Sequence, residues 1–203
     1  MGESEAKRSG KVNSKPDKKT AKEQILNTAI ALFNEHGIHK TGIDRIIAES
    51  GVAKMSFYNN FSSKAKLISE YLRFKEEKRL DSLKRYTVDK SDDPLKQLLG
   101  IFDSLEEWYR EPDFFGCPFI RGLSDFREDD HAELRKQVES HFQKVSDFIE
   151  ERLGSLFPPT QVKKILPQFL SLYIGSTVMA IAGSPPEIAQ SNKKLAMILL
   201  KSN

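Results

Sequence analysis

Apolar residues recur three and four positions apart along most of the chain, from Lys19 almost to the end. This spacing places them on one face of an α-helix, whereas the two-residue alternation of a β-strand is scarce. Glycine, proline and capping residues divide the pattern into about nine segments. The sequence therefore predicts an all-α protein with about nine helices and no strand.

Three local signals set helix boundaries. Residues 41–44 have the spacing of a capping box with Asp in place of Glu, which predicts a helix start. Residues 184–187 combine a capping serine, first-turn prolines and a capping-box glutamate, which predicts the start of the last helix. Pro167 is expected to kink or split a helix over 160–182 because proline lacks an N–H donor.

Residues 1–18 depart from the helical pattern. They are rich in Lys, Ser, Gly and Asn and lack apolar periodicity, which is typical of a disordered tail. Residues 1–66 carry 12 Lys and Arg against 7 Asp and Glu, whereas residues 67–203 carry 20 and 22. A basic front on a slightly acidic body suggests that the N-terminal third meets a polyanion, although a solubilising tail would have the same charge.

The composition argues against several classes of protein. With 38% hydrophobic and 30% charged residues, the chain resembles ordinary soluble globular proteins. Its longest apolar stretch, residues 170–183, is too short and too polar to span a membrane. Its N-terminus is charged where a signal peptide requires an apolar segment. A single cysteine, Cys117, excludes an internal disulfide. We therefore expect a soluble cytoplasmic protein with no membrane partner.

Residues 43–61 place a short helix, a turn at Gly51 and a second short helix in close succession. This is the order of a helix-turn-helix, whose second helix enters the DNA major groove. Phe57 and Phe61 lie four residues apart and can share a buried face. A helical hairpin with a polar outer face remains an alternative. The side chains left to face DNA are Lys54, Met55, Ser56, Tyr58, Asn59 and Asn60.

Lys64 favours the nucleic-acid interpretation. It lies in the first turn of a helix that Ser62 or Ser63 caps, where the helix dipole disfavours a cation. A helix N-terminus with two serines and a lysine is instead well suited to bind a phosphate. Taken alone, Lys64 fits an incidental surface lysine at least as well.

Residues 19–79 resemble the DNA-binding domain of TetR-family transcriptional regulators, from QILNTAIALFNEHG through GIDRIIAESGVAKMSFYNNFSSKAKLI. The family pattern has Gly-Val in the turn, here 51–52. It also has an aromatic-Phe signature followed by a Ser-Lys pair, here Tyr58, Phe61 and 63–64.

The resemblance implies that Thr41, Tyr58 and Lys64 contact phosphates, while the other outward residues of the second helix face the groove. Ser56 stands where the family usually has Thr, and Asn60 where it usually has His or an aromatic residue. These departures leave the preferred bases undetermined.

By the same resemblance, residues 80–203 form an all-helical ligand-binding and dimerisation domain. The implied partners are double-stranded DNA, an unknown small-molecule effector and a second copy of the chain. The aromatic candidates for a ligand pocket are Tyr71, Trp108, Phe115, Phe119 and Tyr173. The candidates for the dimer interface are Leu172, Ser176, Met179, Ile188, Leu195 and Leu199. Both sets also fit an ordinary core.

Other candidate chemistry is weaker. His131 and His141 lie ten residues apart on one expected helix and so point to different sides, which favours capping and surface roles over a metal site. Cys117 has no adjacent cation, which favours a buried, inert thiol. The sequence contains no phosphate-binding glycine loop, nucleophile elbow or HExxH motif, so we expect neither enzymatic activity nor a cofactor.

The sequence thus favours a dimeric, ligand-responsive repressor that binds a pseudo-palindromic operator. Two rivals remain. One is a regulator of the same fold that senses oxidation through Cys117. The other is a helical module that binds proteins or lipids and has no specific DNA role.

Overall fold

The computed structural model describes residues 20–126 and 131–202, and these form nine α-helices and no strand, as predicted. The expected tail, residues 1–18, lies outside the described residues. The helices are α1 (Ala21–His36), α2 (Ile43–Ser50), α3 (Lys54–Asn60), α4 (Lys64–Tyr86), α5 (Pro94–Arg110), α6 (Pro118–Asp125), α7 (Ala132–Gly154), α8 (Pro159–Ile181) and α9 (Ile188–Lys201).

Side-chain caps explain where several helices begin. The Thr20 hydroxyl accepts the N–H of Glu23, and the Glu23 carboxylate accepts the N–H of Thr20, so α1 starts with a complete capping box. Ser63 accepts the N–H of Lys66 at the start of α4. Asp93 caps α5, where proline follows at the first helical position.

The structure corrects two local predictions and narrows a third, the kink or split expected at Pro167. The N-cap of α2 is Gly42, which has no side chain to cap the helix. The Thr41 hydroxyl, which was expected to cap it, turns inward instead. The last helix begins at Ile188, and residues 184–187 form the preceding turn. Pro167 does not split α8, which runs continuously from residue 159 to 181.

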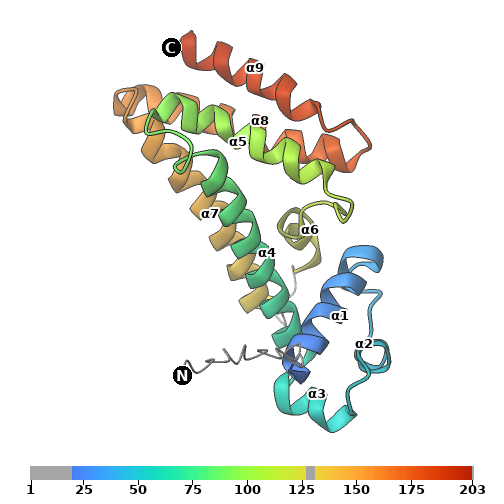
Figure 1. Cartoon of the computed structure of the whole chain (residues 1–203). Helices are drawn as coiled ribbons and strands as arrows, with labels where there is room; N and C mark the ends of the chain where they lie inside the picture. Colours follow the sequence, from blue (N-terminus) through green and yellow to red (C-terminus); the bar gives the residue numbers. More distant parts are fainter. Residues whose placement is uncertain (1–19, 127–130, 203) are drawn as a thin grey trace, which may run out of the picture.

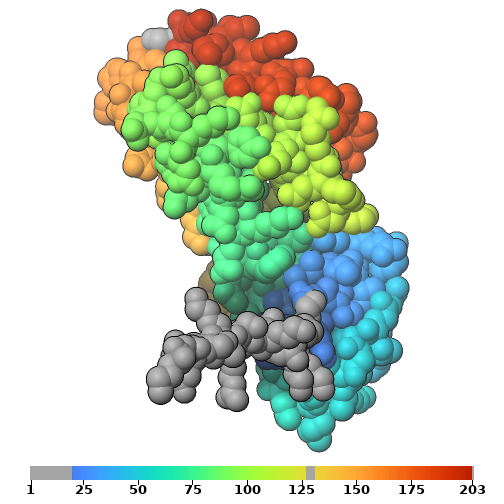
Figure 2. Space-filling model, viewed as in Figure 1, coloured from blue at the N-terminus to red at the C-terminus, as the bar shows by residue number. Residues whose placement is uncertain are grey.

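The helices form two lobes that α4 connects (Figure 1). Helices α1, α2 and α3 make the N-terminal lobe and pack around the start of α4. Helices α5, α7, α8 and α9 make the C-terminal lobe, in which α7 also lies along α4. In the space-filling view the N-terminal lobe, coloured blue to cyan, stands apart from the red and orange end of the molecule (Figure 2).

Two apolar clusters hold these lobes. The first centres on Phe33, Phe57 and Leu67 and extends into α6 and α7 through Phe119 and Val138. The second lies among α5, α7, α8 and α9. Trp108 packs against both clusters. The N-terminal lobe is therefore joined to the rest of the molecule by continuous packing.

Helix α8 begins well before residues 170–183, the apolar stretch that is by itself too short to span a membrane. Its 23 residues are long and apolar enough to cross a membrane by length and composition alone. Helices in the core of a protein meet the same criteria, and α8 packs against α5, α7 and α9.

Candidate nucleic-acid interface and adjoining cavity

Helix α3 is fixed from beneath by two phenylalanines. Phe57 is fully buried and Phe61 nearly so, and their ring centroids lie 6.1 Å apart. Ile46 of α2 is also fully buried in the same cluster. The predicted shared face of the two rings is therefore present, and it turns the opposite face of α3 to solvent.

The turn between α2 and α3 requires the glycine found there. Gly51 has φ 69° and ψ 14°, in the left-handed region. An L side chain adopts this conformation only with strain, whereas glycine adopts it freely. The turn sets the angle at which α3 leaves α2.

The outward face of α3 carries long side chains with few partners. Met55 is 72% exposed and Tyr58 is 43% exposed. The Lys54 ammonium lies 3.9 Å from the Asp44 carboxylate, at the edge of ion-pair distance. Asn59 and Asn60 are also exposed on α3, whereas Ser56 is half-buried.

Two of the residues expected to contact phosphates are less exposed. Lys64 is half-buried in the first turn of α4, and burial lowers the pKa of its ammonium. Thr41 is fully buried, and its hydroxyl donates to the carbonyl oxygens of Leu32 at 3.3 Å and Gly37 at 2.8 Å. The Thr41 side chain thus supports the turn between α1 and α2 rather than facing outward.

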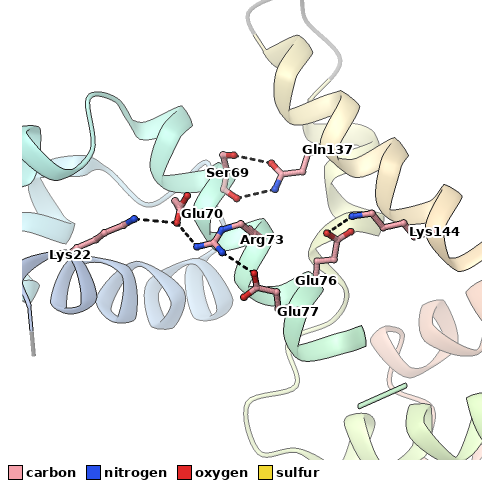
Figure 3. Close-up of polar contacts among 8 residues, drawn as sticks. All are labelled: Lys22, Ser69, Glu70, Arg73, Glu76, Glu77, Gln137 and Lys144. Atoms are coloured by element: carbon pink, nitrogen blue, oxygen red, sulfur yellow. Dashed lines mark hydrogen bonds and ion pairs between the residues drawn. The ribbon is translucent and has the colours of Figure 1, made fainter. Parts of the chain in front are cut away.

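Helix α4 is bridged to a neighbour on each side (Figure 3). Toward the N-terminal lobe, Lys22 of α1 lies 3.6 Å from Glu70. Toward α7, Ser69 and Gln137 exchange two hydrogen bonds, of 3.1 and 3.0 Å. A displacement of α4 would therefore reach both α1 and α7.

A small cavity lies beside α4, between it and residues of α5, α6, α7 and α8. Its volume is about 40 Å³, room for roughly two or three water molecules. Three of the predicted pocket residues line it, namely Trp108, Phe119 and Tyr173.

The other two predicted pocket residues lie elsewhere. Tyr71 and Phe115 line a second cavity of about 170 Å³, between the end of α1 and the start of α6. The Tyr71 hydroxyl donates to Asn34 at 3.1 Å. The structure therefore does not bring the five predicted residues into one site.

The polar lining of the 40 Å³ cavity was not predicted from the sequence. Lys75, Lys78 and Arg79 enter it from α4, and His141 enters it from α7. Lys78 and Arg79 lie three and four residues after Lys75, so the helix face that they share with Lys75 could have been predicted from the sequence. That this face turns inward depends on how α4 packs, which the local pattern does not show.

The expected surface role of His141 was wrong. It is 3% exposed, and its ring stacks on Phe119 with centroids 3.6 Å apart. Burial lowers its pKa to about 4, against the attraction of Glu76, whose Oε1 lies 3.4 Å from Nδ1. The other Glu76 oxygen accepts a bond of 2.8 Å from Lys144 (Figure 3). His131 precedes α7 as its N-cap, and no group of potential metal ligands gathers in the described residues.

Cys117 lies in the wall of the same cavity and is buried. Burial raises the pKa of its thiol. Since the thiolate is the form that reacts with oxidants, this environment opposes a role as an oxidation sensor.

Helices α8 and α9 carry an exposed apolar surface, which we call the α8–α9 surface. It comprises Val178, Met179, Ile181, Leu195 and Ile198, each at least 42% exposed. Among the other predicted interface residues, Leu172, Ile188 and Leu199 are half-buried. Ser176 is fully buried inside the chain, so its side chain does not reach this surface.

Comparison with known proteins identifies the N-terminal lobe. Residues 25–71 match the family model described as bacterial regulatory proteins, tetR family. An uncharacterized HTH-type transcriptional regulator of Bacillus subtilis, YxaF, is 35% identical over 94 residues, or 42% of this chain and 49% of that protein. The HTH-type transcriptional repressor KstR2 of Mycobacterium tuberculosis is 34% identical over 96 residues, or 46% of this chain and 43% of that protein.

The chain thus spans less than half the length of these curated relatives. The whole fold is similar to the crystal structure of a TetR-family transcriptional regulator from Streptomyces coelicolor. The TM-score is 0.79 at 24% identity, and the match covers 90% of this chain and 95% of that one.

Proposed function

Because residues 25–71 match the model of the tetR family of bacterial regulatory proteins, we propose that this chain is a ligand-responsive repressor of that family. It binds a pseudo-palindromic operator as a dimer. Residues 19–79 read DNA, and residues 80–203 bind the effector and the second copy. The observation that carries this proposal is the exposed face of α3, supported on two buried phenylalanines.

The exposed face of α3 has the chemistry to read a major groove. Asparagine amides pair with adenine edges, and lysine pairs with guanine or phosphate. Tyr58 lies in the last turn of α3 and Lys64 is the first residue of α4, and their hydroxyl and ammonium groups suit phosphates. The Asn60 amide donates to the Ser56 carbonyl oxygen at 2.8 Å. It would have to give up this hydrogen bond in order to donate to a base.

The α8–α9 surface supports dimerisation. Contiguous exposed apolar side chains on a soluble protein mark sites of association. Two helices from each copy, packed face to face, would bury these residues in a four-helix interface. The dimer then presents two copies of α3 to successive major grooves, about 34–36 Å apart.

The position of α4 supports the ligand response. This helix lines the 40 Å³ cavity, contacts α1 through Lys22 and Glu70, and begins directly after α3. An effector larger than two or three water molecules must displace the cavity wall to enter. Moving α4 would alter the spacing of the two recognition helices, and operator DNA would in turn weaken effector binding by the same factor.

The DNA-binding claim is tested by selecting genomic fragments with the purified protein at about 150 mM salt, where specific and non-specific affinities differ by about 10³-fold or more. We expect one inverted repeat to be recovered. Tyr58→Ala should lose it, and Lys96→Ala, an exposed change on α5, should retain it. Recovery of unrelated fragments by all three proteins would favour the interaction-module rival.

The dimer claim is tested by Leu195→Glu, which places a charge at a half-exposed position of the α8–α9 surface. We expect analytical ultracentrifugation to find a dimer for the unaltered protein and a monomer for this variant. Leu123→Glu is the matched control, since this leucine is 37% exposed on α6. Equal masses for the two variants would place the interface elsewhere.

A further inference from the structure

Arg79 is buried, and the groups that its guanidinium contacts are neutral. The residue is only 7% exposed and lies in the wall of the 40 Å³ cavity. Its two terminal nitrogens donate to the carbonyl and hydroxyl oxygens of Ser104, at 3.4 and 3.0 Å. Its Nε–H has no hydrogen-bond partner. The guanidinium carbon lies 5.3 Å from the centre of the Trp108 ring.

This guanidinium forms no ion pair with any carboxylate of the described residues. Burying a charge without a counter-ion costs several kcal/mol in a typical protein interior, so such charges are normally paired. Arginine stays protonated even when buried, so it cannot lose its charge as a lysine can. The structure thus holds a permanent cation in the wall of an aromatic-lined cavity.

The remaining charges of the cavity do not neutralise Arg79. Glu111 accepts a hydrogen bond of 2.7 Å from Lys78, so these two charges satisfy one another. Lys75 adds a further cation, although burial lowers its pKa. The nearby Glu76 carboxylate accepts from Lys144 and faces His141. The lining therefore retains a surplus of positive charge.

We propose that the cavity recognises an organic anion, whose carboxylate or similar oxyanion accepts from Nε of Arg79 while its apolar body packs on Trp108 and Phe119. The proposal rests on the ligand-responsive function proposed above and names the chemical class of its effector. The guanidinium offers a planar fork of donors that matches a carboxylate or phosphonate.

The small volume of the cavity means that binding requires movement of the protein. An oxyanion group by itself nearly fills 40 Å³, so the apolar body has to displace the lining helices. Since Arg79 is on α4, the oxyanion would bind to the same helix that the apolar part of the ligand displaces. Neutral apolar compounds would lack the attraction that offsets this displacement.

The test uses Trp108, the single tryptophan of the chain, as a reporter inside the site. Its fluorescence is titrated with phenylacetate, with phenylphosphonate and with the neutral phenylacetamide, in the absence of DNA. We expect at least one anion to bind ten-fold or more tightly than the amide. In Arg79→Met that preference should disappear, whereas Arg85→Met, an exposed change on α4, should keep it.

Circular dichroism establishes that Arg79→Met is folded, and replacing an unpaired buried charge by an apolar side chain of similar length favours this. Equal affinity for the amide and the anions, binding of none of the three, or an unchanged preference in Arg79→Met would each overturn the proposal. Operator selection by the same preparation decides the regulator function independently. An anion that binds through Arg79 and leaves operator affinity unchanged would sustain this inference and refute the ligand response.

Discussion

The two lobes place their polar functional groups in opposite environments. In the N-terminal lobe the core is apolar, and the candidate reading residues stand outside it, with Met55 at 72% and Tyr58 at 43% exposure. In the cavity between α4 and the C-terminal lobe, the candidate sensing residue Arg79 is only 7% exposed and the neighbouring lining residue His141 only 3%. A long polyanion can be met only by an exposed surface, whereas a small molecule is recognised by groups removed from water.

This difference in exposure determines whether a substitution that impairs binding also lowers the stability of the fold. Removing an exposed side chain from α3 costs little folding free energy, because the residue contacts few neighbours. Altering a buried polar group of the cavity disturbs packing, charge and recognition together.

The largest expected effect is in the core of the N-terminal lobe. Phe57→Ala removes a fully buried ring from the support of α3 and should lower the free energy of unfolding by about 3–5 kcal/mol. Urea unfolding followed by circular dichroism measures this loss. The adjacent, half-exposed Tyr58→Ala should cost about 1 kcal/mol or less while abolishing operator selection. Similar stability losses in the two variants would contradict the contrast between the faces of α3.

The second prediction concerns pH and the buried histidine. His141 has a pKa lowered from 6.5 to about 4, so the unfolded chain binds more protons than the folded one in this range. Its contribution to stability is complete above pH 6.5 and is lost as the pH falls toward 4, by on the order of 3 kcal/mol. His141→Gln should lose less stability over the same interval in denaturant titrations. Parallel pH profiles for the two proteins would show that His141 does not titrate as described.

The third prediction compares one substitution at two glycines. A methyl group at Gly100 would meet the backbone oxygen of Tyr86, where α5 approaches the end of α4. Gly100→Ala should therefore destabilise by about 1–3 kcal/mol. Gly154→Ala meets open space and should be neutral or stabilising by up to about 1 kcal/mol. Thermal unfolding of the two variants checks the sign, and a stabilised Gly100→Ala would contradict the close approach of α5 to α4.

The smallest expected effect concerns a single phosphate contact. Lys64→Ala should weaken binding to all DNA sequences alike and reduce the slope of log affinity against log salt by about 1. Lys96→Ala on α5 should leave that slope unchanged. Fluorescence anisotropy at several salt concentrations measures both, and an unchanged slope for Lys64→Ala would remove this residue from the interface.

Local signals allowed much of the N-terminal lobe to be predicted from sequence. The four-residue spacing of Phe57 and Phe61 fixed the buried face of α3, and Gly51 fixed the turn. Both depend on residues close together in the chain. The inward-turned Thr41 escaped prediction because its partners, Leu32 and Gly37, occupy the preceding helix end.

The cavity depends on contacts between distant residues, which explains why its chemistry was missed. Arg79 and Ser104 are 25 positions apart, and His141 meets Phe119 from a different helix. Spacing on one helix cannot reveal such pairs. The aromatic candidates divided between two cavities for the same reason, with Tyr71 joining Phe115 rather than Trp108.

Exposed residues of α3 are proposed to bind DNA, and buried residues of the cavity to bind the effector. This division is tested most directly by operator specificity measured in the absence of effector. The ratio of affinities for the selected operator and a scrambled fragment is measured for the unaltered protein, Tyr58→Ala and Arg79→Met. We predict that Tyr58→Ala lowers this ratio by ten-fold or more, whereas Arg79→Met preserves it. Equal ratios for the two variants would contradict the assignment of reading and sensing to separate parts of the molecule.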